Sequence, residues 1–195
     1  MSNSTSLFFI YELMGSKHLS RLLCFIAKYH GVSSIILLGD TVSPEIIQWL
    51  SSKCKVNIYG VLGRLDNASI ANTLRNINGL IECKATSIKN VVIYGYGFSG
   101  CSHKLSSISK VDVLVTSIPG LKYTCCGSRS DIVDDVVEAF KPRLIITGDC
   151  MKPCFKDNVF SPGSIRKGFI GLVEVKDLFP TPRWVNIYDF IINVG

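Results

Sequence analysis

The stretch VSSIILLGD, residues 32–40, is a nearly continuous apolar run that ends in a Gly-Asp pair. Such runs are typical of parallel strands that are buried on both faces of a sheet. On its N-terminal side, residues 19–30 carry leucine and isoleucine at helical spacing, and a short apolar run at residues 6–11 precedes them. On its C-terminal side, a helical pattern at residues 43–50 leads to another run at residues 56–59. This alternation predicts a parallel sheet with crossover helices.

A second series of elements fills the rest of the chain. Its predicted strands cover residues 91–95, 111–116, 144–147, 168–175 and 184–192. Residues 130–140 form a predicted helix whose apolar side chains share one face. From Asn158 onward the pattern becomes antiparallel, with a proline-rich turn between the last two strands. We therefore expect an α/β sandwich, with two sheets face to face and helices outside, in a single domain over residues 1–195.

The composition is that of a folded domain. Hydrophobic residues make up 47% of the 195 residues and charged residues 18%, which excludes a disordered chain. No apolar run approaches the roughly 20 residues that a membrane helix needs. The polar, uncharged start at residues 1–6 does not fit a signal peptide. The sequence predicts a cytoplasmic protein without membrane contact.

The net charge of +6 results from 21 Lys and Arg against 15 Asp and Glu. A basic protein favours anionic partners in general. The basic residues, however, are scattered in small groups such as Arg166-Lys167 and form no run. This distribution favours a solvated basic surface, with nucleic-acid binding as the alternative.

Eight cysteines are many for a cytoplasmic chain. The spacing around Cys125-Cys126 and between Cys150 and Cys154 matches no zinc-binding pattern. Others, such as Cys24, lie beside apolar segments, where a thiol behaves as a small hydrophobic group. The pattern predicts buried free thiols. One or two disulfides are the alternative, with Cys150–Cys154 as the first pair to test.

The loops that follow the predicted strands are where ligands bind in open α/β sheets. Five of these loops carry polar residues or glycine. They are YELMG at 11–15, LGD at 38–40, GRLD at 63–66, TSIP at 116–119 and TGDCM at 147–151.

In order and spacing, these loops resemble those of the calcineurin-like metallophosphoesterases, particularly the small single-domain branch. In that family the loops read DxHG, GD, GNxD, TH and GHxH, and a PGS turn like Ser161–Ser164 leads to the final strands. The resemblance covers roughly residues 7–175. It implies an αββα sandwich of mixed parallel and antiparallel strands, with two metal ions that activate water for phosphoester hydrolysis.

Three of the seven ligand positions carry carboxylates. The bridging aspartate of the family corresponds to Asp40, which is the one unchanged ligand. The first aspartate corresponds to Glu12, which is one methylene longer, and a histidine of the last loop corresponds to Asp149. These residues can still bind a hard divalent ion.

The other positions carry groups unsuited to the family's metals. Met14, Ser117 and Met151 replace histidines, and Arg64 replaces the asparagine. Leu65 stands where the histidine that protonates the leaving group often stands. The chain's own histidines are elsewhere, at His18, His30 and His103.

We expect Arg64 to replace the metal ions by pairing with Glu12, Asp40 and Asp149, because closely packed carboxylates repel one another. In the alternative, Arg64 points to solvent and the three carboxylates hold one ion. Asp66 is expected to shape its loop.

The two methionines are interpreted as core residues that fill gaps in a collapsed site, Met14 and Met151. The loop glycines are expected where turns need unusual backbone angles or close approach.

The preferred functional hypothesis is a catalytically degenerate protein of this fold, metal-free and without catalytic residues, that binds or scaffolds a protein partner. Residues 155–160 or 179–184 are candidate contact patches, with ordinary packing of aromatic residues as the alternative.

Two other functions are open. One is a phosphoesterase with a rebuilt site, in which Glu12, Asp40 and Asp149 hold one divalent ion such as manganese and Arg64 stabilises developing charge. The other is metal-free binding of a phosphate or nucleotide by Arg64 and Ser117, provided that Arg64 is not occupied by the carboxylates.

Overall fold

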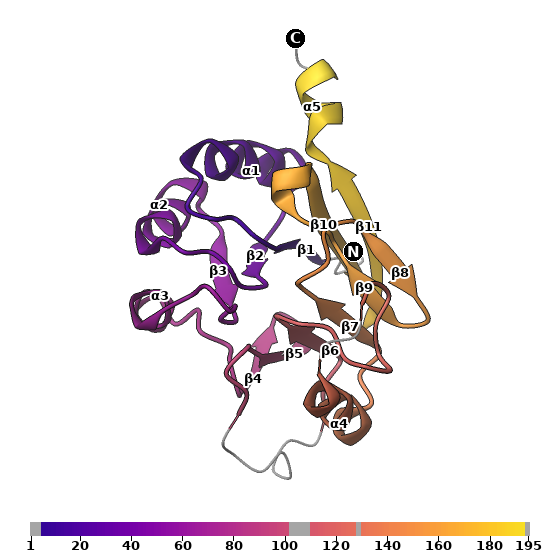
Figure 1. Ribbon diagram of the computed structural model, residues 1–195. Helices are drawn as coiled ribbons and strands as arrows, with labels where there is room; N and C mark the ends of the chain where they lie inside the picture. Colours follow the sequence, from indigo (N-terminus) through magenta and orange to yellow (C-terminus); the bar gives the residue numbers. More distant parts are fainter. Residues whose placement is uncertain (1–4, 102–109, 128–129, 194–195) are drawn as a thin grey trace.

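The computed structural model describes residues 5–101, 110–127 and 130–193. Two mixed sheets pack face to face, and helices cover the outer face of each sheet (Figure 1). The predicted αββα sandwich of parallel and antiparallel strands is therefore confirmed.

The first sheet has five strands. In spatial order they are β11 (Phe179–Asn186), β10 (Phe169–Lys176), β1 (Thr5–Ile10), β2 (Ser34–Leu37) and β3 (Asn57–Gly60). Strands β1, β2 and β3 are parallel, whereas β10 is antiparallel to both of its neighbours. The parallel half is the strand–helix series that residues 6–59 predict.

The second sheet has six strands. In spatial order they are β4 (Ala85–Ile88), β5 (Val91–Tyr96), β6 (Val113–Thr116), β7 (Leu144–Thr147), β9 (Val159–Ser161) and β8 (Cys154–Lys156). The four inner strands are parallel, and the edge strands β4 and β8 are antiparallel to their neighbours. Sequence patterns did not predict the short strands β4, β8 and β9.

Helices lie on both outer faces of the sandwich. They are α1 (Lys17–Tyr29), α2 (Pro44–Cys54), α3 (Ala68–Asn76), α4 (Asp131–Phe140) and α5 (Ile187–Asn193), with a short 3-10 helix, η2, at Ile165–Lys167. Helices α1 to α3 pack on the first sheet and α4 on the second. The unpredicted helix α3 is capped by Asn67, whose side chain accepts a hydrogen bond from the nitrogen of Ser69 at 2.9 Å.

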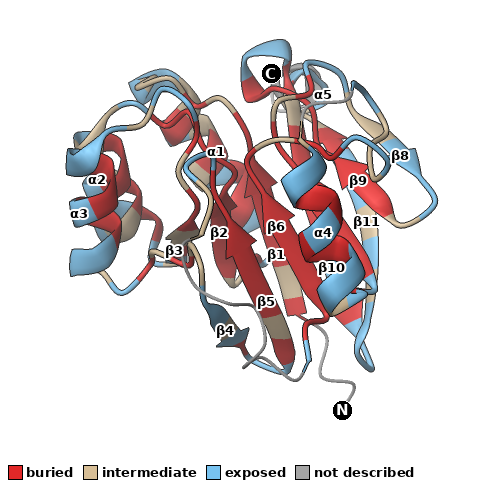
Figure 2. Cartoon of the chain, turned by 60° about the horizontal axis from the view of Figure 1, so that its bottom comes forward, coloured by how far each residue is buried: buried red, intermediate tan, exposed pale blue. Residues whose placement is uncertain are grey.

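The core forms three layers: between α1–α3 and the first sheet, between the two sheets, and between the second sheet and α4. Strand β2 is buried on both faces, as the run at residues 32–40 predicts. Ile35 and Leu37 pack toward the helices, and Ile36 packs between the sheets. The burial of most strand residues is visible in Figure 2.

The predicted strand at residues 184–192 is confirmed only at residues 184–186, where β11 ends, and is wrong beyond them, where α5 begins. The hairpin turns at Asp177 and Leu178, which have positive φ, so the prolines lie within β11 rather than in a turn. The strand tolerates Pro180 and Pro182 because it is an edge strand and needs no amide donor on its open side. The chain then forms α5, where the side chain of Asn186 accepts a hydrogen bond from the nitrogen of Tyr188.

All eight cysteines form disulfides, so the prediction of buried free thiols is wrong. The pairs are Cys24–Cys54, Cys83–Cys101, Cys125–Cys154 and Cys126–Cys150. The Cys150–Cys154 pair is wrong as well, because each of these residues meets a member of the adjacent pair at 125–126. Partners lie 18 to 30 residues apart, so tertiary structure determines which cysteines meet.

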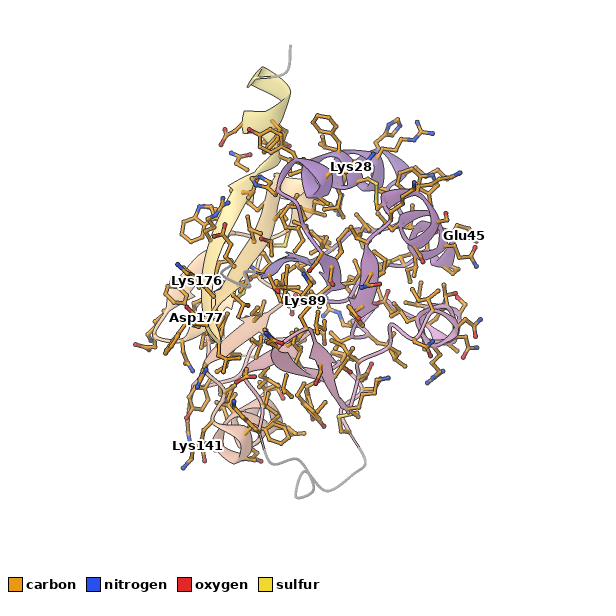
Figure 3. All side chains as sticks on the ribbon, turned by 180° about the vertical axis from the view of Figure 1, so that it is seen from behind. Lys28, Glu45, Lys89, Lys141, Lys176 and Asp177 are labelled. Atoms are coloured by element: carbon orange, nitrogen blue, oxygen red, sulfur yellow. A yellow bond between two sulfur atoms is a disulfide. The ribbon has the colours of Figure 1, made fainter. Side chains whose placement is uncertain are left out.

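The basic side chains are distributed over separate elements. Figure 3 shows Lys28 on α1, Lys89 between β4 and β5, Lys141 after α4 and Lys176 at the end of β10. This arrangement agrees with the scattered charge that the sequence indicates. No helix within the described ranges is both long and apolar enough to cross a lipid bilayer.

Candidate functional site

The predicted site loops meet at the carboxyl ends of the parallel strands. The nitrogen of Met14 donates to the carbonyl oxygen of Asp40 at 3.0 Å, which joins the loops after β1 and β2. The nitrogen of Gly148 donates to the carbonyl oxygen of Thr116 at 2.9 Å, which joins the loops after β6 and β7. Sequence order alone therefore placed these loops correctly.

Four site residues have left-handed backbone angles. The φ values are 64° at Glu12, 49° at Met14, 53° at Asp40 and 53° at Asp149. Such angles are unfavourable for residues other than glycine and persist only where surrounding contacts impose them. The loops are therefore held in sharp turns directly after their strands.

The loops after β2 and β3 approach each other closely at Gly39 and Gly63. An added Cβ at Gly39 would lie 2.5 Å from the Cα of Gly63. An added Cβ at Gly63 would collide with the backbone nitrogen and Oδ1 of Asp40. Glycine is therefore required on both sides of this contact, as the sequence predicts.

Tyr11 links two of the three site carboxylates. Its hydroxyl lies 3.1 Å from Oδ2 of Asp40 and 3.1 Å from Oδ1 of Asp149, so it joins the first sheet to the second. Burial, followed by the charges of Asp149 and Asp40, raises the pKa of Tyr11 well above its ordinary value. The phenol therefore keeps its proton and acts as a donor. Sequence reasoning assigned no role to Tyr11, although it directly precedes Glu12.

Glu12 points toward the turn that follows β9. The hydroxyl of Ser164 donates to its Oε2, and Nη1 of Arg166 lies 3.3 Å from its Oε1. The nitrogen of Arg166 in turn donates to Oγ of Ser164. The cation that neutralises a site carboxylate therefore comes from the Ser161–Ser164 side of the site.

The predicted ion pair of Arg64 with the three carboxylates is wrong. Arg64 is exposed, and its side chain makes no ion pair or hydrogen bond within the described part of the chain. The reason lies in its turn: Leu65 supplies the backbone nitrogen that donates to Oδ1 of Asp40, at 2.9 Å. Arg64 is left exposed, as the alternative interpretation expects, whereas the single ion of that alternative stays a prediction.

Asp66 shapes this turn, as predicted. Its Oδ2 accepts a hydrogen bond from the nitrogen of Gly63 at 2.9 Å, and its Oδ1 accepts one from the nitrogen of Val42 at 2.8 Å. The carboxylate therefore closes its own loop and fixes it to the loop after β2.

The methionines do not both fill the core. Met151 is 47% exposed, so its predicted gap-filling role is wrong, and Met14 is half-buried. Ser117 is buried, and its Oγ has no hydrogen-bond partner among the described residues. Arg64 is exposed, whereas Ser117 is buried. Binding of an anion by these two residues stays a prediction.

A further carboxylate lies at the same strand ends and was missed by sequence reasoning. Oε2 of Glu82 accepts a hydrogen bond from the nitrogen of Leu62 at 3.1 Å, and the carboxylate lies against Gly97. Burial raises the pKa of Glu82 above its ordinary value. It comes from the segment between α3 and β4, which carries no motif that could have indicated it.

Neither His18 nor His30 contributes a side chain to this site. His18 is exposed on α1, and His30 ends that helix and packs edge-on against Phe8. His103 lies outside the described residues. The candidate contact patches at residues 155–160 and 179–184 contain both exposed and buried aromatic side chains. Phe155 and Trp184 are exposed, whereas Phe160 is fully buried and contacts both of their rings.

The residues present do not fit a two-metal centre. Within the described ranges, the ligand atoms of Glu12, Asp40 and Asp149 do not gather within 4.8 Å of one another. Manganese and magnesium take about six oxygen or nitrogen ligands each, some of which are water. With Glu12 held by Ser164 and Arg166, the carboxylates left are Asp40 and Asp149, and no histidine or asparagine stands at the other predicted ligand positions.

Neither a protein-family model nor a curated protein matches the sequence. Solved structures do share its fold. TT1561 of Thermus thermophilus has a TM-score of 0.71 at 13% identity, over 95% of this chain and all of that one. A novel archaeal phosphodiesterase has a TM-score of 0.63 at 14% identity, over 93% and 99%. GAP50, the anchor in the inner membrane complex of Plasmodium, has a TM-score of 0.63 at 10% identity, over 94% and 85%.

Identities this low show the fold and nothing about the reaction. The likeness nevertheless extends over nearly the whole chain in each case, and it agrees with the order of the site loops. The protein therefore has the fold of the small metallophosphoesterases.

Proposed function

We propose that this chain is a catalytically degenerate metallophosphoesterase-fold protein that works without metal as a binding module. The observation that carries the proposal is the position of the Tyr11 hydroxyl, 3.1 Å from both Asp40 and Asp149. A protonated phenol has one hydrogen, which it donates to one carboxylate or shares between the two, so it links Asp40 and Asp149 without an ion.

The third carboxylate is also satisfied within the chain. Glu12 accepts a hydrogen bond from Ser164 and pairs with Arg166 at 3.3 Å. An incoming ion would therefore have to displace a serine hydroxyl and a guanidinium. This supports a site that is held together by its own side chains.

The position that corresponds to the family's leaving-group acid carries no titratable side chain. Leu65 occupies the corresponding position and is 51% exposed. His18 is exposed in the first turn of α1, and His30 is the C-cap of that helix. General acid catalysis needs a titratable group within hydrogen-bond reach of the leaving oxygen, and Leu65 cannot supply one.

Exposed apolar side chains on these loops support a binding role. Val42, Leu65 and Phe98 are 38%, 51% and 45% exposed. Hydrogen bonds join their loops: the nitrogen of Val42 donates to Asp66, and the nitrogen of Phe98 donates to the carbonyl oxygen of Leu62 at 2.9 Å. Apolar groups that gather on a surface are typical of protein contacts.

The fold has a precedent for such a role. GAP50 is named as an anchor, which is an assembly function, and its fold resembles that of this chain. We extend only the class of function to this chain, a protein-binding module, and name no partner from that likeness.

The catalytic half of the proposal is tested with manganese. The purified chain is dialysed against manganese chloride, its metal content is measured, and a chromogenic phosphodiester is offered as substrate. We expect little bound metal and no turnover above the blank, both for the unchanged chain and for Asp40→Ala. Manganese-dependent turnover that disappears in Asp40→Ala would overturn the proposal.

The binding half is tested with matched surface variants. Leu65→Asp alters the apolar surface at the strand ends, and Phe25→Asp alters an equally exposed aromatic on α1. Proteins cross-linked to the chain in its source cells should be lost with Leu65→Asp and kept with Phe25→Asp. Equal loss or equal retention in both variants would contradict binding at this surface.

A further inference from the structure

Three sulfur atoms gather beside the loop that carries Asp149. The Sγ atoms of Cys126, Cys150 and Cys154 all lie within 4.8 Å of one another. Cys126 belongs to the loop between β6 and α4, Cys150 follows β7, and Cys154 begins β8. Within the ranges that the structure describes, this is the one group of three or more His, Cys, Asp or Glu residues close enough to share an ion.

These sulfurs belong to two different disulfides. Cys126 is bonded to Cys150, and Cys154 is bonded to Cys125. The other two disulfides, Cys24–Cys54 and Cys83–Cys101, have no third ligand of this kind within the same reach among the described residues. Either disulfide alone would join residues 125–126 to the segment at residues 150–154. The second disulfide therefore brings two more sulfur atoms close to the first.

We propose that reduction of these two disulfides converts the cluster into a zinc site with Cys126, Cys150 and Cys154 as ligands. Thiolates bind zinc at about 2.3 Å, so two sulfurs of a tetrahedral site lie roughly 3.8 Å apart. Cys126 and Cys150 are bonded to each other in the oxidised chain and move apart on reduction, whereas the sulfur of Cys154 already lies within 4.8 Å of both. Cys125, the present partner of Cys154, is the nearest further sulfur for the fourth position.

The reduction of the two disulfides is balanced in atoms and electrons when a phosphine is the reductant. Each disulfide takes up two electrons and two protons and becomes two thiols. A phosphine reductant supplies the electrons and ends as the phosphine oxide, with oxygen and protons from water. Zinc then displaces thiol protons, and its charge neutralises the thiolates.

Burial favours a structural ion. Cys150 is only 2% exposed, and a buried thiolate is unstable unless a cation lies beside it. Cys126 is exposed, which gives both the reductant and the ion access to the cluster. In either state, the segment at residues 125–126 remains fastened to the loop that carries Asp149.

The experiment measures zinc directly. The full chain is reduced with a phosphine in the absence of oxygen, incubated with zinc, passed over a desalting column and analysed for metal. The reduced chain is expected to keep about one zinc ion. The double variant Cys24→Ala/Cys54→Ala, which lacks a disulfide outside the cluster, should keep the same amount. The chain with its disulfides intact should keep none.

The variants Cys150→Ala and Cys126→Ala should lose most of the zinc. Because Cys126 is exposed, its variant remains informative if Cys150→Ala does not fold. Cobalt gives a second measurement: the reduced chain should show the sulfur-to-cobalt charge-transfer band, and Cys126→Ala should weaken it. The proposal is overturned if the reduced chain keeps no zinc, or if Cys126→Ala keeps as much zinc as the unchanged chain.

Discussion

Arg166 pairs with Glu12 across the site, with 3.3 Å between Nη1 and Oε1. The sequence suggested Arg64 for this role, because Arg64 replaces a metal-binding asparagine. The paired cation instead comes from η2, directly after the turn at Ser161–Ser164. Glu12 is therefore neutralised by a residue outside the seven ligand positions that the sequence suggested.

The two arginines should differ in their effect on stability. Arg166→Ala should lower the free energy of unfolding by about 0.5 to 1 kcal/mol, because the ion pair is partly exposed and Glu12 loses a partner. Arg64→Ala should change it by less than about 0.5 kcal/mol. Urea denaturation of both variants checks this. A larger loss for Arg64→Ala than for Arg166→Ala would mean that Arg64 is paired after all.

The raised pKa of Tyr11 predicts a loss of stability in alkali. Above about pH 10, the unfolded chain releases the phenolic proton, whereas the folded chain retains it. The free energy of unfolding should therefore fall as pH rises, and Tyr11 should contribute up to about 1.4 kcal/mol per pH unit. Below about pH 10, the contribution of Tyr11 to the free energy of unfolding is fully present.

Tyr11→Phe isolates the contribution of this residue, since Tyr94 and Tyr96 also have raised pKa values. Stability of the variant, measured by denaturation between neutral pH and pH 11, should decrease less steeply than that of the unchanged chain. At neutral pH the variant should already be about 1 to 3 kcal/mol less stable, because the carboxylates lose their shared donor. Parallel curves would contradict the assigned role of Tyr11.

Gly63→Ala should be strongly destabilising. The added Cβ collides with the backbone nitrogen and Oδ1 of Asp40, so the two loops must separate. We expect a loss of about 2 kcal/mol or more. Gly127→Ala is the matched control, because an added Cβ there meets nothing within 4 Å. Thermal unfolding should show a large shift in the first variant and almost none in the second.

Removal of the disulfide between α1 and α2 should lower stability by about 3 to 4 kcal/mol, the entropy expected for a closed loop of this length. The bond joins residues 30 positions apart, Cys24 and Cys54. Denaturation of Cys24→Ala/Cys54→Ala without reductant measures the loss. A thiol reagent should also detect one free thiol in the single variant Cys24→Ala. If the double variant unfolds like the unchanged chain, these cysteines are not bonded.

Sequence patterns predicted the fold where the signal was local. The apolar run at residues 32–40 required a strand buried on both faces, and Ile35 and Ile36 do face different core layers. The Gly-Asp and Gly-x-x-Asp loops were recognisable because close backbone approach and left-handed turns restrict the residue types at Gly39, Asp40 and Gly63.

Features that depend on tertiary contacts were not predictable from local patterns. The direction of Arg64 follows from hydrogen bonds that Leu65 and Asp66 make, not from the arginine itself. The shared donor role of Tyr11 requires two sheets to meet. The disulfide partners are likewise selected by the folded chain, which is why residue spacing suggested the wrong pair.

The prolines of β11 hinder the pairing of this edge strand with a strand of a second molecule. Pro180 pairs in register with Val175 and Pro182 with Val173, so the two occupy alternate positions of the same strand. Neither has an amide hydrogen, so a strand from another chain that docked there would find no donor at either position. The border of the sheet is thereby protected against continued growth into a second molecule, which lowers the tendency of the protein to aggregate through β-sheet extension.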